Sequence, residues 1–407
     1  QRQMCIRDRH RPYHLAGSIV MGLAGVSESD DSEIIRKAVS AAAESVFGED
    51  SPSTSHLLQL LGLAAGHPDD SPEVLHTYYS DALAGLITGL AATHSPLVLI
   101  CEDAHWADAS SAELISGLVD HLQQSAALLV IVSRPDRDAH GWDIIARARR
   151  DLGDTFVDVT LAPLDDSSSR QLVANLLEIE SLSDGLRELV LSRTEGNPFF
   201  IEEVVRMLVD RNLITEVDGH WVAERKISNL DVPDTLQGLL ASRLDSLRPD
   251  VRRVAMVAAV IGRRFESRLL TSVLESQVGG TGAIPASAAL GALEGQGLIK
   301  LAATRPELAF SFRHALIHDV TYESVLKKDR RQLHGAVADA LAHIHSERLE
   351  EEAPTLARHY GEAGASAAAL RYLLLAGQTA LSRHALPESH DFYSRAAALV
   401  EDDPNAT

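Results

Sequence analysis

The sequence predicts an α/β domain built on a parallel sheet, followed by an all-α region with a winged-helix-like unit and the start of a helical repeat. Two apolar runs, Leu97–Cys101 and Ala127–Val132, each end in polar residues, as strands buried on both faces of a parallel sheet do. Helical periodicity separates these runs and dominates from Asp165 onward, which favours strand–helix alternation succeeded by helices. After Pro354 the chain is alanine-rich, with apolar stripes on two predicted helices.

The elements of the first half are predicted in order along the chain. Apolar residues at helical spacing predict helices between Ser32 and His94. Asp108 is the expected N-cap of a helix after the first strand, and a further helix comes after the second strand. The segment Phe156–Leu161 is expected to form a third strand.

The second half is mainly helical, with two short strand pairs. Gly196-Asn197-Pro198 interrupts the helical pattern, and its proline is expected to open a new helix. A hairpin is predicted over Leu213–Ala223, turning at Asp218-Gly219. Strands at Leu298–Leu301 and Leu308–Phe312 lie between helices, an order typical of a winged-helix unit.

The composition describes a globular chain with a strongly acidic surface. Its 407 residues correspond to two or three domains at ~150 residues each, and 45% of them are hydrophobic. The 58 acidic and 37 basic residues give a formal net charge of −21, which disfavours direct contact with nucleic acid or anionic membranes. Only Cys5 and Cys101 could form a disulfide, and no apolar run approaches the ~18 residues of a membrane span. The chain is therefore expected to be cytoplasmic, without disulfides or a structural zinc site.

The first nine residues are expected to lie outside the fold. Gln1–Arg9 has no apolar period and joins abruptly to the next segment, so it resembles a non-native tail more than a folded segment.

Two acids directly succeed the first predicted strand. In open α/β sheets, ligands bind outside the carboxyl ends of the strands, which is where Glu102 and Asp103 lie. One carboxylate of such a pair can hold the water shell of Mg²⁺, and the other can orient an attacking water. Solvated acids that merely end a strand are the alternative interpretation.

A basic residue lies just after the second predicted strand. Arg134, within Ser133-Arg134-Pro135, could sense the charge of a terminal phosphate from this edge of the sheet. Its alternative interpretation is a surface arginine that precedes a turn. His105 and Asp108 lie near the acids, but no second histidine at ligand spacing supports a transition-metal site.

The phosphate-binding loop of nucleotide-binding proteins does not occur in this sequence. No Gly-x-x-x-x-Gly-Lys-Ser/Thr is present, and the chain has no Gly-Lys dipeptide. That loop supplies a backbone N–H cradle and a lysine charge to the phosphates. The chain by itself is therefore expected to bind ATP weakly and to be inactive as an ATPase.

Several motifs together resemble one family of switch ATPases. LVLICEDAHWAD (residues 97–108) resembles the extended Walker B segment of the signal-transduction ATPases with numerous domains (STAND), a branch of the AAA-like P-loop ATPases. GNPFFIEEVVRML (residues 196–208) resembles their Gly-Asn-Pro motif. Residues 232–247, 258–265 and 310–326 are similar to their winged-helix segment. The resemblance is greatest to the ATPase region of bacterial regulators with an adenylate/guanylate cyclase domain in front or a LuxR-type DNA-binding domain behind.

The resemblance implies roles for individual residues. Glu102 and Asp103 match the Walker B acids, which would hold Mg²⁺ through water, and the resemblance leaves open which of them faces the metal. Arg134 matches the sensor arginine, and the motif Gly196-Asn197-Pro198 matches the one that packs near adenine. His314 falls where related ATPases place a winged-helix histidine against the ADP phosphate, although a structural role for a lone histidine beside a strand is the alternative. ATP or ADP with Mg²⁺ is the implied cofactor.

The resemblance also implies an organisation and a function. The fold is then an incomplete P-loop NTPase-like parallel sheet with a winged-helix domain and the start of a tetratricopeptide-like solenoid. The family's phosphate loop would precede residue 1, so the chain is expected to be N-terminally truncated. The expected boundaries are 1–9 for the non-native tail, 10–163 for the nucleotide-binding domain, 164–230 for a helical lid, 231–345 for the winged helix and 346–407 for the repeats.

Two functions remain open at the sequence level. The first is a slow, regulatory ATP-binding switch of a multidomain regulator, whose repeats read a protein partner or a small-molecule inducer and which could oligomerise with nucleotide. The second is a nucleotide-free helical scaffold that binds protein partners. Direct DNA binding, through a reading helix near Arg263 and Arg264, is disfavoured by the acidic field.

Overall fold

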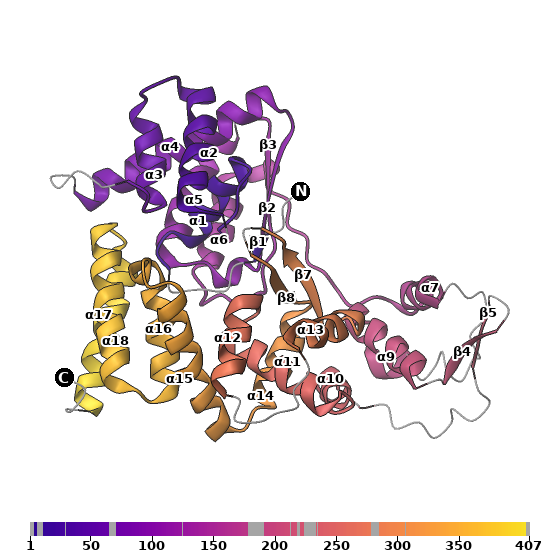
Figure 1. The fold of residues 1–407 in the computed structure, drawn as a ribbon. Coiled ribbons are helices and arrows are strands. Elements are labelled where there is room, and N and C mark those ends of the chain that lie inside the picture. The colour runs from indigo at the N-terminus through magenta and orange to yellow at the C-terminus, as the bar shows by residue number, and fades with distance from the viewer. Residues whose placement is uncertain are drawn as a thin grey trace.

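The computed structural model places the chain in an α/β domain, a segment of two helices and a hairpin, a three-strand unit and a stack of C-terminal helices (Figure 1). It describes residues 4–5, 11–28, 30–64, 71–123, 125–177, 191–211, 213–217, 220–223, 233, 235–277, 285–305 and 307–403. Of the predicted tail at residues 1–9, only Met4–Cys5 lies within these ranges, and it pairs with the parallel sheet, which corrects the expectation that all nine residues lie outside the fold. The predicted turn at Asp218-Gly219 lies outside the described ranges.

The α/β domain has a small parallel sheet with helices packed against it. Its strands β1 (Met4–Cys5), β2 (Leu97–Glu102) and β3 (Ala127–Ile131) lie in the order β1-β2-β3, and both pairs are parallel. The predicted parallel pairing of the two apolar runs is thus confirmed. The helices of this domain are α1 (His14–Leu23), α2 (Ser32–Phe47), α3 (Pro52–Leu60), α4 (Pro72–Thr93), η1 (Ala104–Trp106), α5 (Ala109–Leu122), α6 (Gly141–Asp151) and η2 (Gly153–Thr155).

Of β2 and β3, only β2 has buried residues, and the face of the sheet opposite to them is partly exposed, which corrects the prediction that both strands are buried on both faces. Leu99 and Cys101 are buried, whereas Val98 and Leu128 are about half exposed. Val98 and Leu128 are direct partners across the β2–β3 ladder and therefore share a face of the sheet. Helices α4 and α5 contact the strands and account for the buried face.

The prediction of a third strand at Phe156–Leu161 is wrong. These residues carry no strand assignment, and Val157, Val159 and Leu161 are each more than two-thirds exposed. Their alternating pattern suits a strand, but a strand also needs a hydrogen-bonded neighbour, which the pattern cannot supply.

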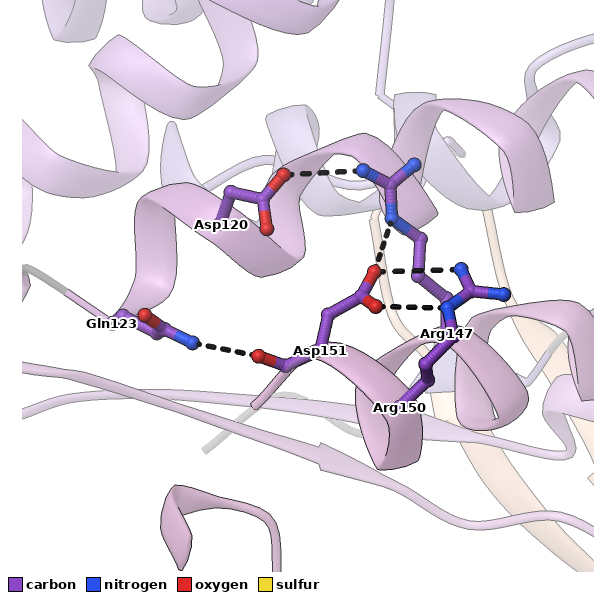
Figure 2. Close-up of polar contacts among 5 residues, drawn as sticks. All are labelled: Asp120, Gln123, Arg147, Arg150 and Asp151. Carbon is purple, nitrogen blue, oxygen red and sulfur yellow. Dashed lines mark hydrogen bonds and ion pairs between the residues drawn. The ribbon is translucent and has the colours of Figure 1, made fainter. Parts of the chain in front are cut away.

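A polar cluster ties α6 to α5 beside the sheet. Arg147 forms ion pairs with Asp120 of α5 at 3.1 Å and with Asp151 at 3.3 Å, and both pairs are drawn in Figure 2. Arg150 binds the same Asp151 carboxylate at 2.8 Å, and Gln123 donates to the Asp151 carbonyl at 3.2 Å. These contacts fix the C-terminal end of α6 against α5. Because α6 is a rigid helix, they also fix the position of the N-terminal end of α6.

The middle of the chain forms a segment with two helices and the predicted hairpin. The segment comprises α7 (Asp166–Leu177), α9 (Pro198–Asp210), β4 (Ile214–Val217) and β5 (His220–Ala223). Antiparallel pairing of Ile214 with Ala223 and of Val217 with His220 confirms the hairpin. Helix α9 contacts both α7 and the next helix, α10 (Leu236–Asp245), and in Figure 1 the hairpin projects from the side of the molecule.

The three-strand unit consists of α10–α14 and an antiparallel sheet of order β6-β8-β7. The two strands that the sequence predicts here are β7 and β8, and β6 adds to them. The elements are α10 (Leu236–Asp245), α11 (Pro249–Ile261), β6 (Arg264–Glu266), α12 (Ser267–Gln277), α13 (Ala286–Gly295), β7 (Ile299–Ala303), β8 (Ala309–Phe312) and α14 (Ala315–Glu323). That this unit is a winged helix stays a prediction.

The C-terminal stack consists of four helices, each packed on the next: α15 (Lys327–Ile344), α16 (Leu349–Ala363), α17 (Ser366–Ser382) and α18 (Leu386–Asp402). The stack also contacts the α/β domain, below which it lies in Figure 1. The carboxylate of Glu388 on α18 accepts hydrogen bonds from the backbone N–H of Ser110 at 3.0 Å and from its hydroxyl at 2.6 Å. Arg11 forms an ion pair with Glu352 at 2.8 Å.

Among the described residues, no helix combines the length and the apolar character that crossing a membrane requires.

Candidate site between the sheet edge and the three-strand unit

The two predicted acids lie at the carboxyl end of β2, as expected from the sequence. Glu102 is the last residue of the strand, and Asp103 comes next with a left-handed backbone (φ 55°) at the start of η1. Non-glycine residues adopt this conformation rarely, and such positions cluster at functional sites. The chain therefore turns sharply at the point where the sheet presents its acids.

The Asp103 carboxylate is bound by a residue 160 positions away. The Arg263 guanidinium, on the three-strand unit, donates to Asp103 Oδ2 at 2.7 Å. Both side chains are partly buried, with exposed fractions of 18% for Arg263 and 30% for Asp103. This ion pair joins the sheet edge of the α/β domain to the three-strand unit, and it identifies Asp103 as an acid that faces that unit.

The position of Arg263 results from the pairing of β6 with β8. Arg264 lies opposite Ser311 in the ladder, and the Phe312 N–H donates to the Arg263 carbonyl at 2.9 Å. Arg263 therefore lies beside the end of β8, which leads directly to His314. The idea that Arg263 belongs to a DNA-reading helix is wrong, because it precedes a strand and binds a carboxylate.

His314 lies in the same group of charges. Burial is the largest cause of a lowered His314 pKa, with the positive charges of Arg263 and Arg134 next, while Asp103 and Asp319 oppose the shift. Its Nδ1 accepts the Leu316 N–H at 3.2 Å and so caps α14. The neutral ring therefore carries its proton on Nε2, which makes that nitrogen a hydrogen-bond donor.

Arg134 keeps its predicted place after the second strand. Its side chain is exposed, and its charge acts on His314 of the other unit. Its backbone N–H lies 3.5 Å from Nδ1 of the buried His105, which holds the turn against η1. The structure thus brings Asp103, Arg134, Arg263 and His314 into one electrostatic group.

The residue that follows the Gly196-Asn197-Pro198 motif, Phe199, contacts this group. The Phe199 ring stacks on the His314 ring at a centroid distance of 4.1 Å and an interplanar angle of 16°. Pro198 itself is exposed at the first turn of α9. Three segments far apart in the sequence therefore meet around His314.

Each residue of the motif also has a local structural role. Gly196 has a positive φ of 72°, and a Cβ there would lie 2.2 Å from the Leu164 carbonyl oxygen. The Asn197 side chain caps α9 by accepting the Phe200 N–H at 3.2 Å, and proline suits the first helical turn because it needs no N–H donor there.

Contacts with the helices α1, α5 and α6 hold the loop that carries Asp103 in place. The Asp108 carboxylate, which is 2% exposed, accepts the Ser111 N–H at 2.8 Å and the Tyr13 N–H at 3.0 Å. The predicted N-cap role of Asp108 is thus confirmed, and the same side chain also holds the start of α1. Gly141 at the start of α6 approaches so closely that a Cβ there would lie 1.8 Å from the Ala104 carbonyl oxygen.

Sequence reasoning missed two residues of this site, Arg263 and Phe199. Arg263 was visible only as part of a basic pair, because its acidic partner is set by the β6–β8 pairing and by domain packing. Phe199 lies within the segment 196–208 that resembles the Gly-Asn-Pro motif, but the sequence pattern does not show that its ring stacks on His314. Within the described parts of the chain, no group of three or more His, Cys, Asp or Glu side chains could hold a metal ion directly.

Two family models match the chain. A model described as an AAA ATPase domain matches residues 8–131, which include both Glu102 and Asp103. A second model, described as a domain of unknown function, matches residues 165–221, which include α7, α9, β4 and the first half of β5.

Two curated relatives share sequence similarity with parts of the chain. An uncharacterised protein of Rhizobium meliloti (strain 1021) is 28% identical over 310 residues, or 75% of this chain. A hybrid signal transduction histidine kinase of Dictyostelium discoideum is 32% identical over 99 residues, or 24% of this chain. The chain spans 28% of the length of the first relative and 3% of the second.

A solved structure shows the same fold. The signal transduction ATPase with numerous domains from Pyrococcus horikoshii, which carries a tetratricopeptide repeat sensor, superposes with a TM-score of 0.51 at 13% identity. The match covers 94% of this chain and 48% of that one. The comparisons therefore show a match to an AAA-type ATPase domain at residues 8–131 and a fold similar to that of a STAND ATPase.

Proposed function

We propose that this chain is a nucleotide-controlled switch module, in which ATP or ADP with Mg²⁺ binds between the sheet edge and the three-strand unit. The observation that carries the proposal is the Asp103–Arg263 ion pair, which links the two parts at the carboxyl end of the parallel sheet. The AAA ATPase match over residues 8–131 and the STAND-like fold support the same assignment.

The residues present suit Mg²⁺ held through water. Magnesium in nucleotide sites keeps several waters and uses one or two carboxylates together with the phosphates of the ligand. Glu102 and Asp103 provide two adjacent carboxylates at the sheet edge. When bound, the ion would neutralise phosphate charge and Asp103 would hold its water shell.

The cationic groups of the site suit the phosphates. Arg134 and Arg263 offer guanidinium donors from opposite parts of the site, and His314 offers its Nε2 proton. In this proposal the Gly196-Asn197-Pro198 motif lies on the side of the purine, which places Phe199 and His314 between base and phosphates.

The switch would operate by exchange of ion-pair partners. In the structure, Asp103 and Arg263 neutralise each other and hold the three-strand unit against the sheet. A magnesium-bound nucleotide offers a cation to Asp103 and phosphate oxygens to Arg263, so each charge keeps an opposite partner when the pair separates. The angle between the two parts then depends on the nucleotide, and the C-terminal stack, which contacts both parts, would pass the change to a partner or sense one.

The test is an equilibrium titration of the chain with MgATP at concentrations up to the millimolar range. Wild type is expected to bind saturably and only with Mg²⁺ present, and Asp103→Asn and Arg263→Gln should each weaken binding about tenfold. Arg264→Gln is the matched control, because it removes the same charge one residue away at an exposed position. Wild-type affinity in both site variants would refute the proposal.

The second candidate is a nucleotide-free scaffold that binds protein partners. The observation in its favour is that Asp103 is already neutralised by Arg263, so a purely structural role accounts for the acid. Absence of saturable MgATP binding by wild type, together with lower stability of both Asp103→Asn and Arg263→Gln, would support the scaffold.

The wider context is also part of the proposal. We place the chain in a bacterial, cytoplasmic multidomain regulator, with slow hydrolysis, a winged-helix role for the three-strand unit and oligomerisation that depends on nucleotide. The support is the similarity to a much longer curated relative and to a STAND protein with a tetratricopeptide repeat sensor.

A further inference from the structure

A second cluster of basic residues surrounds a cavity far along the chain from the nucleotide site. The cavity has a volume of about 720 Å³ and lies where α14, the start of α15 and the end of α16 meet. Its lining includes Tyr322, Lys327, Lys328, Arg330, Arg331 and Glu362. This volume falls within the range of ~300–1,000 Å³ that is typical of small-molecule sites.

The lining of this cavity is mainly cationic, although the molecule as a whole is strongly acidic. The chain carries a net charge of −21, yet four cationic residues line one cavity within a run of five positions. Lys327, Lys328 and Arg331 are exposed, and none of the four cations forms an ion pair among the residues that the structure describes. The first turn of the long helix α15 adds its positive dipole end to the same place, and the remaining position of the run, Asp329, offsets one of the four positive charges. The local field therefore favours an anion.

Two further side chains shape the cavity. The Arg330 guanidinium lies 4.6 Å from the centre of the Tyr322 ring, which holds both groups in a fixed arrangement. Glu362 adds one carboxylate to the wall, and a carboxylate accepts hydrogen bonds but repels an unshielded anion. An anion that also carries hydroxyl donors satisfies both kinds of lining.

A chain of hydrogen bonds, buried at its centre, leads from the cavity into the helix stack. The Arg358 guanidinium can only donate, so His359 Nε2 accepts at 3.0 Å and the His359 proton lies on Nδ1. His359 Nδ1 then donates to His334 Nδ1 at 2.8 Å. The remaining His334 proton lies on Nε2 and is donated to the Tyr322 hydroxyl at 3.0 Å. Each donor–acceptor direction is fixed by the one before it.

The same tyrosine connects to the three-strand unit. The His318 ring stacks near the Tyr322 ring at 6.2 Å, and His318 also meets Phe312 of β8 edge-on at 5.3 Å. His318 Nε2 lies 2.9 Å from the Ala259 carbonyl oxygen of α11. A ligand that contacts Tyr322 therefore touches a group coupled to α11, β8, α15 and α16.

We propose that this cavity binds a small phosphorylated molecule that bears hydroxyl groups, and that Tyr322 transmits its binding to the junction of the three-strand unit and the C-terminal stack. The phosphate lies among Lys327, Lys328, Arg330 and Arg331, and the hydroxyl side faces Glu362. The proposal does not depend on the nucleotide site.

The experiment titrates the full chain with glycerophosphate and with inorganic pyrophosphate by calorimetry at constant ionic strength, with glycerol as the uncharged control. Both anions are expected to bind saturably, and Lys328→Gln/Arg331→Gln should weaken them about tenfold or more. Arg36→Gln/Lys37→Gln on α2 removes the same charge from an exposed site and should leave both affinities within about twofold. Glu362→Gln should strengthen pyrophosphate binding more than glycerophosphate binding, because only glycerophosphate offers hydroxyl donors.

A second measurement locates the bound anion. The imidazole resonances of His334, assigned through their loss in His334→Asn, should shift on glycerophosphate addition in wild type but not in Lys328→Gln/Arg331→Gln. Absence of saturable binding by wild type, or equal weakening in the two double variants, would overturn the proposal. So would binding of a short DNA duplex in place of the small anions.

Discussion

Gly141 shows how a single residue holds the acidic loop in place. Its missing side chain lets α6 begin against the Ala104 carbonyl, one residue after Asp103, and a Cβ would lie 1.8 Å from that oxygen. The contact is with backbone, which cannot move aside as a flexible side chain could. The geometry of the sheet edge therefore depends on this glycine.

Gly141→Ala is expected to destabilise the protein by roughly 1–3 kcal/mol, because the added methyl must displace the η1 backbone. Gly291→Ala is the matched control, since it lies in helix α13 with nothing within 4 Å of an added Cβ. That control should stabilise by up to about 1 kcal/mol through helix propensity. The free energy of unfolding of both variants is measured by urea titration. Equal changes in this free energy for the two variants would contradict the close contact at Gly141.

The buried histidine pair gives a pH dependence with a definite sign. Burial, and after it the charges of Arg358 and Arg330, lowers the pKa of His334 from 6.5 to about 4, and burial also lowers the pKa of His359. Because the folded pKa is depressed, the unfolded chain takes up protons first as the pH falls. The contribution of this pair to the free energy of unfolding is therefore fully present above pH ~6.5, and it is lost as the pH falls toward ~4.

The measurement is the free energy of unfolding between pH 7 and pH 5. Wild type should lose at least roughly 2 kcal/mol more over this range than His334→Gln/His359→Gln, because His334 alone accounts for about that much and the variant has no imidazole at either position. The comparison uses the change in the free energy of unfolding with pH and not its absolute value, because the variant also loses packing. Parallel slopes for the two proteins would show that the histidines do not titrate as described.

At the scale of residues, the sequence predicted local roles well and distant partners poorly. Asp108 was identifiable as a helix cap because capping depends on neighbours in the chain. Arg263 could not be paired with Asp103 in advance, because 160 residues and a strand pairing separate them.

At the scale of elements, the strands illustrate the same limit. The apolar runs at β2 and β3 predicted two parallel strands, but their apparent double-sided burial failed at Val98 and Leu128. Burial depends on which helices cover each face, and that information is not local. Phe156–Leu161 failed as a strand for a related reason, because its alternation gives no pairing partner.

Helix α18 depends on one buried acid for its contact with α5. Glu388 is 6% exposed and accepts two hydrogen bonds from Ser110 at the start of α5. Burial and the nearby Asp108 charge raise the Glu388 pKa, so the contact carries a desolvation cost that the Ser110 bonds offset.

Glu388→Ala should therefore weaken the docking of α18 on α5 by about 1–3 kcal/mol, because the Ser110 N–H loses its acceptor. Hydrogen exchange of the α18 amides should speed up, whereas Glu401→Ala, at an exposed position of the same helix, should leave it unchanged. Unchanged exchange in Glu388→Ala would mean that apolar packing alone holds α18.

At the scale of the whole molecule, three polar contacts join parts of the fold that are far apart in the sequence. Arg263 binds Asp103 across the sheet edge, Glu388 binds Ser110, and Arg11 binds Glu352. The order of the parts could be predicted from the sequence, since each has its own periodicity. Their mutual docking could not, because the polar pairs and the shared apolar core bring together segments 160 to 341 positions apart.

The most direct test of the switch is a distance between the α/β domain and the three-strand unit, measured with and without nucleotide. Spin labels on His121→Cys of α5 and Glu275→Cys of α12, both exposed, report this distance in a Cys5→Ser background. The proposed exchange of partners predicts one narrow distance without nucleotide, a shifted distance with MgATP, and a broadened distance in Arg263→Gln without nucleotide. An identical distance under all three conditions would contradict it.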